Sequence, residues 1–141
     1  MIKQAILKVR TGAAGLHEFT PDVERFVQES SCGQGLVTVF VRHTSCSLLI
    51  QENADPDVRA DLDEFFRRLV PPGDDASMQW IRHGMEGPDD MPGHIKAALT
   101  ATTLSIPVMN GRLALGRWQG IFLFEHRSRV HDREVVLHLS A

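Results

Sequence analysis

The chain of 141 residues contains only two cysteines, Cys32 and Cys46, and lacks the run of about 20 apolar residues that a membrane helix needs. Two cysteines cannot supply the disulfide framework of a small secreted domain, so we expect a reducing compartment. Lys3, Lys8 and Arg10 interrupt the apolar start of the chain, which excludes a secretory hydrophobic core there. These absences predict a cytoplasmic protein without a membrane segment.

Basic patches, repeats and phosphate-binding loops are also lacking. The net charge is -3 and the pI is about 6.1, which argues against a nucleic-acid partner but allows a small anionic substrate. No internal repeat, low-complexity segment or P-loop motif is found. Neither side of the long loop expected at 70–90 would hold a core alone, so we predict a single domain over 1–141.

Hydrophobic patterning and turn signals define the expected secondary structure. Strands are predicted at 2–10, 36–43, 46–51, 104–109, 112–115, 120–126 and 133–139. Asn110-Gly111 is typical of a two-residue type I′ hairpin. Strands, then helices, then a run of antiparallel strands predict an α+β fold with a largely antiparallel β-sheet core and two to three helices.

Three helices are expected. The first has Thr20 as its N-cap and ends near Ser30, before Cys32-Gly33. The second opens at Asp55-Pro56, carries an apolar stripe and ends at Pro71-Pro72. The third is short and covers roughly 91–100. The stripe of the second helix consists of Val58, Leu62, Phe65, Phe66 and Leu69.

The first chemically interesting segment follows the strand at 36–43. His43 shares a face with three valines, as a histidine at the edge of the core would, but hydroxyls, a thiol, a carboxylate and an amide follow it closely. Cys46 is predicted to lie off the face of His43, so we interpret it as a small buried hydrophobe rather than a nucleophile. The polar residues that follow His43 are Thr44, Ser45, Cys46, Ser47, Gln51, Glu52 and Asn53.

The second segment brings two histidines, His83 and His94, close in sequence to Glu86, Asp89 and Asp90. Imidazole and carboxylate are the usual ligands of zinc and related divalent ions. The spacing matches no standard metal motif, and the alternative is that the carboxylates cap a helix while the histidines lie at the surface. Free N–H groups at the helix start would also suit a phosphate.

The third segment, 116–120, places a tryptophan between two glycines and is either a binding element or part of the core. Glu125 and His126 follow it. Because side chains alternate along a strand, only one of them is expected to face the core, and a buried Glu125 would need a partner. The arginine-rich turn at 129–133 is expected to be a solvated loop, with anion binding as the alternative.

Together these stretches resemble the YjbQ family across nearly the whole chain. The matching residues are Arg42-His43-Thr44-Ser45, Gln51-Glu52-Asn53-Ala54-Asp55-Pro56, His83, Glu86-Gly87, Asp89-Asp90-Met91-Pro92, His94-Ile95-Lys96, Ile106-Pro107-Val108, Asn110-Gly111, Leu115-Gly116, Trp118-Gln119-Gly120 and Glu125-His126-Arg127. The family pattern at the tryptophan reads Gly-Thr-Trp-Gln, and Arg117 stands here in place of the threonine.

The resemblance implies a sheet-rich α+β domain that assembles as a homotrimer, with shared polar residues near subunit boundaries and a bound metal in places. It also implies a thiamine-phosphate synthase activity, which joins hydroxymethylpyrimidine diphosphate to thiazole phosphate and releases pyrophosphate. Such a reaction would use a divalent cation on the diphosphate, with cationic or N–H donors nearby.

From residue chemistry and the resemblance together, we assign His83, His94 and His126 as ligands of a divalent ion, zinc or magnesium. His43 is assigned as general acid/base or substrate contact, and Glu52 and Asp90 as polar supports of catalysis. The residues assigned to substrate binding are Asn110, Trp118 and Gln119. The expected partner is a small phosphorylated substrate. The rival hypotheses are a metal-dependent hydrolase of a small phosphorylated metabolite and a non-enzymatic trimer that binds a metal or ligand.

Overall fold

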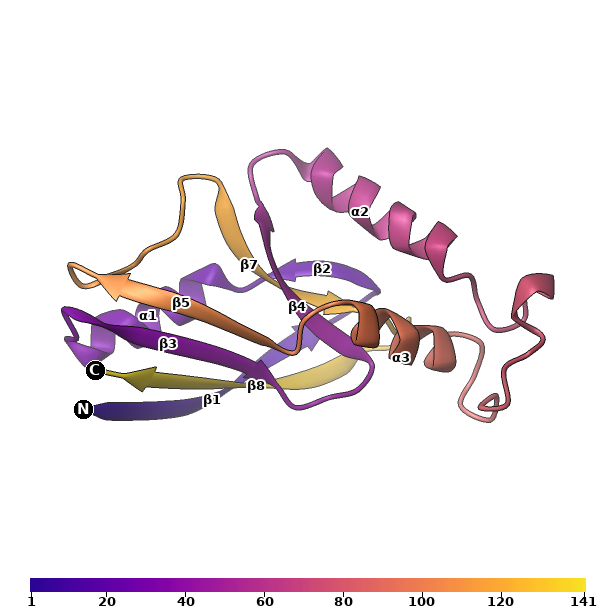
Figure 1. Cartoon of the computed structure of the whole chain (residues 1–141), viewed down its shortest axis with the longest axis horizontal. Helices are drawn as coiled ribbons and strands as arrows, with labels where there is room; N and C mark the ends of the chain where they lie inside the picture. The colour runs from indigo at the N-terminus through magenta and orange to yellow at the C-terminus, as the bar shows by residue number, and fades with distance from the viewer.

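Two antiparallel sheets and three α-helices make up the computed structural model of the chain (Figure 1). The five-stranded sheet has the order β1-β8-β3-β5-β6, and the three-stranded sheet has the order β2-β7-β4. The fold is therefore α+β with an antiparallel core. The elements are β1 (Ile2–Thr11), β2 (Gly15–Glu18), α1 (Thr20–Ser30), β3 (Gln34–Val41), β4 (Cys46–Glu52), α2 (Pro56–Leu69), α3 (Asp90–Leu99), β5 (Thr103–Met109), β6 (Arg112–Leu113), β7 (Gln119–Glu125) and β8 (His131–Ser140).

The five-stranded sheet is half-buried, as its alternating sequence predicts. In β3, Val37, Val39 and Val41 face the core and are almost completely buried, while Leu36 and Phe40 on the other face are exposed. The C-terminal strand β8 lies between β1 and β3 and pairs with both. One face of this sheet is therefore closed by the core, and the other face carries exposed apolar side chains.

The central strand β7 of the smaller sheet is buried on both faces. Its run from Ile121 to Phe124 is at most 1% exposed, which explains why it is continuously apolar rather than alternating. Phe66 of α2 packs edge-on against Phe124, with ring centroids 5.3 Å apart. Figure 1 shows α2 and α3 toward the end of the molecule opposite the two chain termini.

The first helix begins differently from the prediction. Phe19 occupies the N-cap position without a side-chain cap, and Thr20 is already helical. The Thr20 hydroxyl instead donates to Glu18 and accepts from the Ile121 amide. Thr20 was therefore wrongly expected to cap the helix, because its hydroxyl is needed between β2 and β7. The short strand β2 was also missed, since four residues carry too little periodicity.

The second helix begins as predicted, because the Asp55 carboxylate accepts a hydrogen bond from the Asp57 amide and Pro56 occupies the first turn. None of its residues is buried, however. Phe65 and Leu69 are 57% and 54% exposed, so much of the apolar stripe predicted for this helix faces solvent in the single chain.

The loop expected at 70–90 contains a short 3₁₀ helix, Ala76–Met78, and the third helix begins at Asp90. The predicted hairpin is present, with φ of 53° at Asn110 and 77° at Gly111, as a type I′ turn requires. None of the three helices has the length and apolar content that crossing a bilayer would require.

Replacement of Gly35 by alanine tests the close packing at the end of β3. A Cβ at this position would lie 2.7 Å from the Ser140 carbonyl oxygen and 3.1 Å from the Cys32 sulfur. We expect Gly35→Ala to lower the free energy of unfolding by about 1–3 kcal/mol, measured by urea denaturation. Gly33→Ala is the control, because its Cβ would meet no atom within 4 Å. Equal stability of the two variants would contradict the packing argument.

Candidate metal centre

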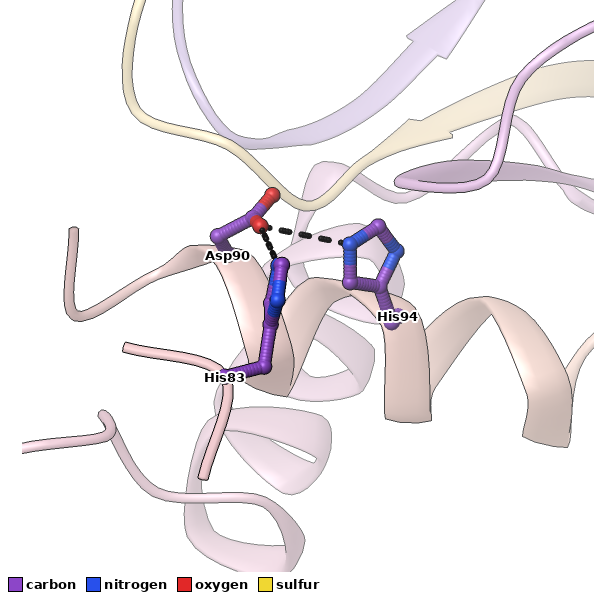
Figure 2. A group of neighbouring side chains, drawn as sticks. All are labelled: His83, Asp90 and His94. Atoms are coloured by element: carbon purple, nitrogen blue, oxygen red, sulfur yellow. Dashed lines mark hydrogen bonds and ion pairs between the residues drawn. The ribbon is translucent and has the colours of Figure 1, made fainter. Parts of the chain in front are cut away.

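Three side chains converge at the start of α3. His83, Asp90 and His94 offer ligand atoms that all lie within 4.8 Å of one another. Figure 2 shows both imidazole rings pointing at one oxygen of the Asp90 carboxylate. Asp90 Oδ2 is 2.7 Å from His83 Nε2 and 3.2 Å from His94 Nε2.

Local structure explains this convergence. Asp90 and His94 are four residues apart in α3, so they share one face of the helix. His83 comes from the loop before the helix, seven residues before Asp90. The other Asp90 oxygen accepts a hydrogen bond of 2.6 Å from Arg127, which fixes the carboxylate. Asp90 is buried, whereas the His83 side chain is 50% exposed, so the group opens to solvent on one side.

The orientation of His94 brings two atoms with lone pairs face to face, with no positive charge between them. His94 Nδ1 donates to the Thr44 carbonyl oxygen at 2.8 Å, so the neutral ring presents a bare lone pair on Nε2. That lone pair faces Asp90 Oδ2 at 3.2 Å, and two acceptors at this distance repel unless a cation stands between them. The cation is either a proton on His94 or a metal ion.

The donor set fits a divalent metal ion. Two imidazoles and one carboxylate are ligands that zinc and similar ions accept, and three protein ligands leave positions open for a substrate or water. Thr44 and Arg127 hold the ligands from behind, as outer partners of metal ligands do.

The Asp90 carboxyl is held in its charged form. Burial acts most strongly and would raise its pKa, but the hydrogen bond from His83 and the positive charges of His94 and Arg127 together hold the pKa below its ordinary value. Asp90 therefore provides a carboxylate rather than a carboxylic acid at neutral pH.

A buried ion pair lies behind this group. Glu125 is fully buried and accepts hydrogen bonds from Arg133, from the Thr11 hydroxyl and from the Arg127 amide. Arg133 also donates to the Ser45 hydroxyl at 3.0 Å. Burial would raise the Glu125 pKa, yet the hydrogen bonds of Arg133 and Thr11 hold it below its ordinary value. The prediction that Glu125 needs a partner is confirmed, and the prediction that Arg133 belongs to a solvated loop is wrong.

His43 lies beyond the end of β3, in the connection to β4 that also carries Thr44. Its Nε2 accepts a 2.8 Å hydrogen bond from the Glu134 amide, which places the proton of the neutral ring on Nδ1. Burial and the charge of Arg133 lower its pKa. With its only lone pair occupied, neutral His43 can donate a hydrogen bond to a substrate but has no free nitrogen to act as a base.

His126 does not join the group, and Asp90 supplies the third ligand atom instead. The His126 ring is buried directly after β7, and its Nε2 lies 2.9 Å from the Ser47 hydroxyl. Burial and the charge of Lys96 lower its pKa to about 3. Glu125 and His126 are both buried, contrary to the expectation from strand alternation, because His126 packs against the close-lying Gly93 of α3.

Four predicted site residues lie at the other end of the β4–β7 pair. Cys46 pairs with Glu125 near the cluster of His83, Asp90 and His94, the candidate metal-binding group. Glu52 pairs with Gln119 at the far end, about 20 Å away along the strand. Glu52 accepts a hydrogen bond from the Asp55 amide, and Asn110 and Trp118 are exposed. The structure therefore separates the predicted residues into two regions.

The sequence did not single out Arg127, Arg133 or the carbonyl of Thr44 as parts of the site. Arg127 belongs to a stretch that resembles the YjbQ family, but nothing in its local sequence pattern indicated a contact with Asp90, 37 positions away. A backbone carbonyl leaves no signal in the residue types at all. The buried Cys46 was predicted correctly, and burial raises its thiol pKa to about 12, which argues against a nucleophile.

A cavity of about 380 Å³ adjoins the candidate metal-binding group. His83 forms part of its wall, and Met78, Ile81 and Met91 give it apolar surface. The volume is in the range of sites for small molecules, roughly 300–1,000 Å³.

Comparison with known proteins connects this geometry to one family. The family described as "UPF0047 protein YjbQ-like" matches residues 5–141. A UPF0047 protein of Synechocystis is 56% identical over 137 residues, covering 97% of this chain and 90% of that protein. The UPF0047 protein YjbQ of Escherichia coli O157:H7 is 38% identical over 134 residues and 94% of each chain.

Solved structures share the fold. An uncharacterized YjbQ/UPF0047 protein of Clostridium acetobutylicum has a TM-score of 0.83 and 33% identity, covering 98% of this chain and 99% of that one. A hypothetical protein of Aeropyrum pernix K1 has a TM-score of 0.87 and 26% identity, covering 99% and 98%. None of these names states a reaction.

Replacement of His126 by glutamine tests whether the buried His126 ring stays uncharged in the folded chain. Below the ordinary histidine pKa of 6.5 the unfolded chain binds a proton here, whereas the folded chain does not until about pH 3. The wild type should therefore lose stability as the pH falls from 6.5, by at most about 1.4 kcal/mol per pH unit from this residue. His126→Gln should show a shallower loss between pH 6.5 and 4 in urea denaturation.

The control is His17→Gln, whose ring is bound to the Ala13 carbonyl oxygen and which leaves His126 in place. It should keep the steeper loss of stability that the buried His126 ring causes. If His126→Gln keeps it as well, the buried neutral state of His126 is refuted.

Proposed function

The chain belongs to the UPF0047 YjbQ-like family, and on this premise we propose that it is a metal-assisted enzyme that acts on a small phosphorylated substrate at His83, Asp90 and His94. The specific reaction proposed is thiamine-phosphate synthesis, in which hydroxymethylpyrimidine diphosphate and thiazole phosphate combine and pyrophosphate is released. We place the protein in the cytoplasm, and its two free, buried cysteines accord with this.

The arrangement of Asp90 and His94 is the observation that carries the proposal. The Asp90 oxygen and the His94 nitrogen that face each other both carry lone pairs, so a cation is needed between them. His83 adds a third metal-ligand atom near the same point. Because His83 and His94 are both partly exposed, a substrate can reach that point from solvent. A closed structural metal site would instead surround the ion with four protein ligands.

The adjoining cavity supports a substrate with a small ring. Its apolar side chains suit the body of a heterocycle, and His83 lies in its wall, so a phosphate attached to that ring would reach the metal-binding group. A divalent ion bound there would offset the negative charge that develops on a departing diphosphate.

The chain's own residues then have positioning roles. Arg127 and Thr44 hold Asp90 and His94 in place, which spares the group from rearranging when substrate binds. His43 carries its proton on Nδ1 and is assigned to donate a hydrogen bond to the substrate rather than to remove a proton.

Hydrolysis is the second candidate, and the 50% exposure of the His83 side chain favours it. Water can approach the open side of the group, and metal-bound water is a common nucleophile toward phosphate esters. Phosphate or pyrophosphate release without the thiazole partner would support this reading.

We also propose that the protein is a homotrimer. On the outer face of the five-stranded sheet, Ile6, Val136 and Phe40 lie in register across β1, β8 and β3. Ile6 and Phe40 are 58% and 45% exposed, and no element of the chain covers them. An apolar sheet face of this kind fits a second copy of the chain.

Removal of the two histidines should abolish metal binding. We expect the tag-free wild type, after incubation with zinc, manganese or magnesium, to retain one divalent ion per chain in elemental analysis, and the His83→Ala/His94→Ala variant to retain none. His17→Ala is the control, because this histidine of β2 binds the Ala13 carbonyl oxygen and is not one of the three proposed ligands. A wild type that retains no metal would overturn the metal centre.

The same proteins test the reaction. Thiamine phosphate formation, followed by chromatography, should depend on the added ion and should be lost in the double variant but kept in His17→Ala. Tight metal binding without turnover at any pH would instead support the non-enzymatic hypothesis.

Replacement of Phe40 by aspartate should dissociate the assembly, because a charge in the apolar centre of an interface is costly to bury. Light scattering should give the wild type about three times the chain mass of 15.7 kDa and Phe40→Asp one chain mass. Lys8→Asp, on the same strand face but already polar, should remain trimeric. A monomeric wild type would refute the proposal.

A further inference from the structure

A small cavity of about 160 Å³ lies between the C-terminal end of α2, the helix α3 and the residue that follows β7. His126 and Val70 are buried residues of its lining, whereas Arg67 and Pro72 are exposed, so the cavity opens to solvent on their side. A water molecule takes up about 30 Å³ in the liquid, and the cavity therefore has room for a small organic ion.

One ring nitrogen of His126 has no hydrogen-bond partner within the chain. Nε2 lies 2.9 Å from the Ser47 hydroxyl, which accounts for one of the two nitrogens. Nδ1 makes no hydrogen bond, although the residue is only 4% exposed. Buried polar atoms nearly always have a partner, so we expect the missing one in the cavity that His126 lines.

Lys96 brings a positive charge to the same cavity. It is half-buried in α3, and its ammonium group forms no ion pair with any carboxylate of the chain. Lys96 also lies close enough to His126 for its charge, after burial, to be the second cause that lowers the pKa of that ring. An unpaired cation beside an unpartnered ring nitrogen indicates an anionic ligand.

The other charges of the lining are already paired. Arg67 forms ion pairs with two carboxylates of its own helix. Asp89 lies 3.2 Å from Arg127 Nε and accepts two hydrogen bonds from Ser128. Lys96 is therefore the one charge of the lining without a counterion, and a ligand with a single negative charge would balance it.

The rest of the lining is apolar. Val70, Pro72 and Pro92 present hydrocarbon surface to the cavity. A phosphate has no apolar part to place against this surface, and its second charge would be repelled by Asp89. A carboxylate on a short hydrocarbon chain matches both the single unpaired charge and the apolar walls.

We propose that this cavity binds a small monocarboxylate with a short hydrocarbon chain, such as propionate. The carboxylate lies between the Lys96 ammonium group and the Nδ1 hydrogen of His126, and the chain contacts the apolar walls. For Nδ1 to carry the hydrogen, the Ser47 hydroxyl must donate to Nε2. The site goes beyond the proposed function, because none of the three proposed metal ligands lines this cavity.

Nitrogen-15 NMR of the histidine rings tests the proposal on the full chain at constant ionic strength. Propionate should shift the Nδ1 resonance of His126 until it saturates, and the spectrum at saturation should show the hydrogen on Nδ1. The resonance is identified by its loss in His126→Gln. Propionamide, which has nearly the same shape without the charge, and inorganic phosphate should bind at least about ten-fold more weakly.

Three results of these titrations would overturn the proposal. They are an unchanged His126 resonance, a hydrogen on Nε2 at saturation, and binding of propionamide or phosphate as tight as that of propionate.

A lysine variant locates the binding. Lys96→Gln should weaken propionate binding at least about ten-fold, because the charged hydrogen-bond donor is lost. Lys8→Gln is the matched control, with the same substitution at an exposed position of β1 outside the lining. It should bind propionate as the wild type does. Thermal unfolding checks that both variants are folded, and equal binding by a folded Lys96→Gln would refute the site.

The metal centre is tested separately, because carboxylates also bind divalent ions. Propionate binding should persist in EDTA and in the His83→Ala/His94→Ala variant. Binding that is lost there but kept in Lys96→Gln would place propionate at the candidate metal-binding group and refute the cavity site, while leaving the proposed function intact. A wild type that binds propionate but retains no metal would support the cavity site and overturn the proposed function.

Discussion

The ion pair between Glu125 and Arg133 joins four parts of the chain at the end of the molecule where the candidate metal-binding group forms. Glu125 ends β7, Arg133 lies in β8, and their hydrogen bonds reach Thr11 in β1 and Ser45 before β4. A buried charge without its partner costs about 3–5 kcal/mol, so neither residue can be lost alone. The ion pair fixes the two sheets relative to each other at this point. It thereby also fixes the starting positions of the loops that follow their strands.

Those loops set the geometry of the candidate metal-binding group. The amide of Arg127 is bound by Glu125, and its side chain orients Asp90. Ser45 is bound by Arg133, and the neighbouring Thr44 orients His94. The ion pair contacts none of the proposed ligands. Arg127, which binds Asp90, and Thr44, which binds His94, are nevertheless both held in place through hydrogen bonds to this ion pair or to the residue beside it. Preorganisation of this kind would reduce the rearrangement needed for the proposed cation and substrate to bind.

The sequence predicted the parts of the structure that depend on local pattern. The main strands, the type I′ turn and the Asp55 cap follow from alternation, backbone preference and side-chain chemistry. Residue chemistry and the family resemblance together pointed to His83 and His94 as metal ligands and to Asp90 as a polar support. Thr20 and His126 were misjudged because their roles depend on partners such as Glu18 and Ser47 that only the folded chain brings near. Tertiary contacts of this kind leave no periodic signal.

The position of β8 has a consequence for how the chain folds. Because β8 lies between β1 and β3, residues at the start of the chain must pair with residues at least 120 positions later before the larger sheet is complete. Such non-local pairing slows folding, since the long intervening chain must be ordered first. During synthesis on the ribosome, the edges of β1 and β3 that pair with β8 would remain unpaired until β8 has been synthesised. Arg133 belongs to that same strand, so we expect the candidate metal-binding group to form only in the last step of folding.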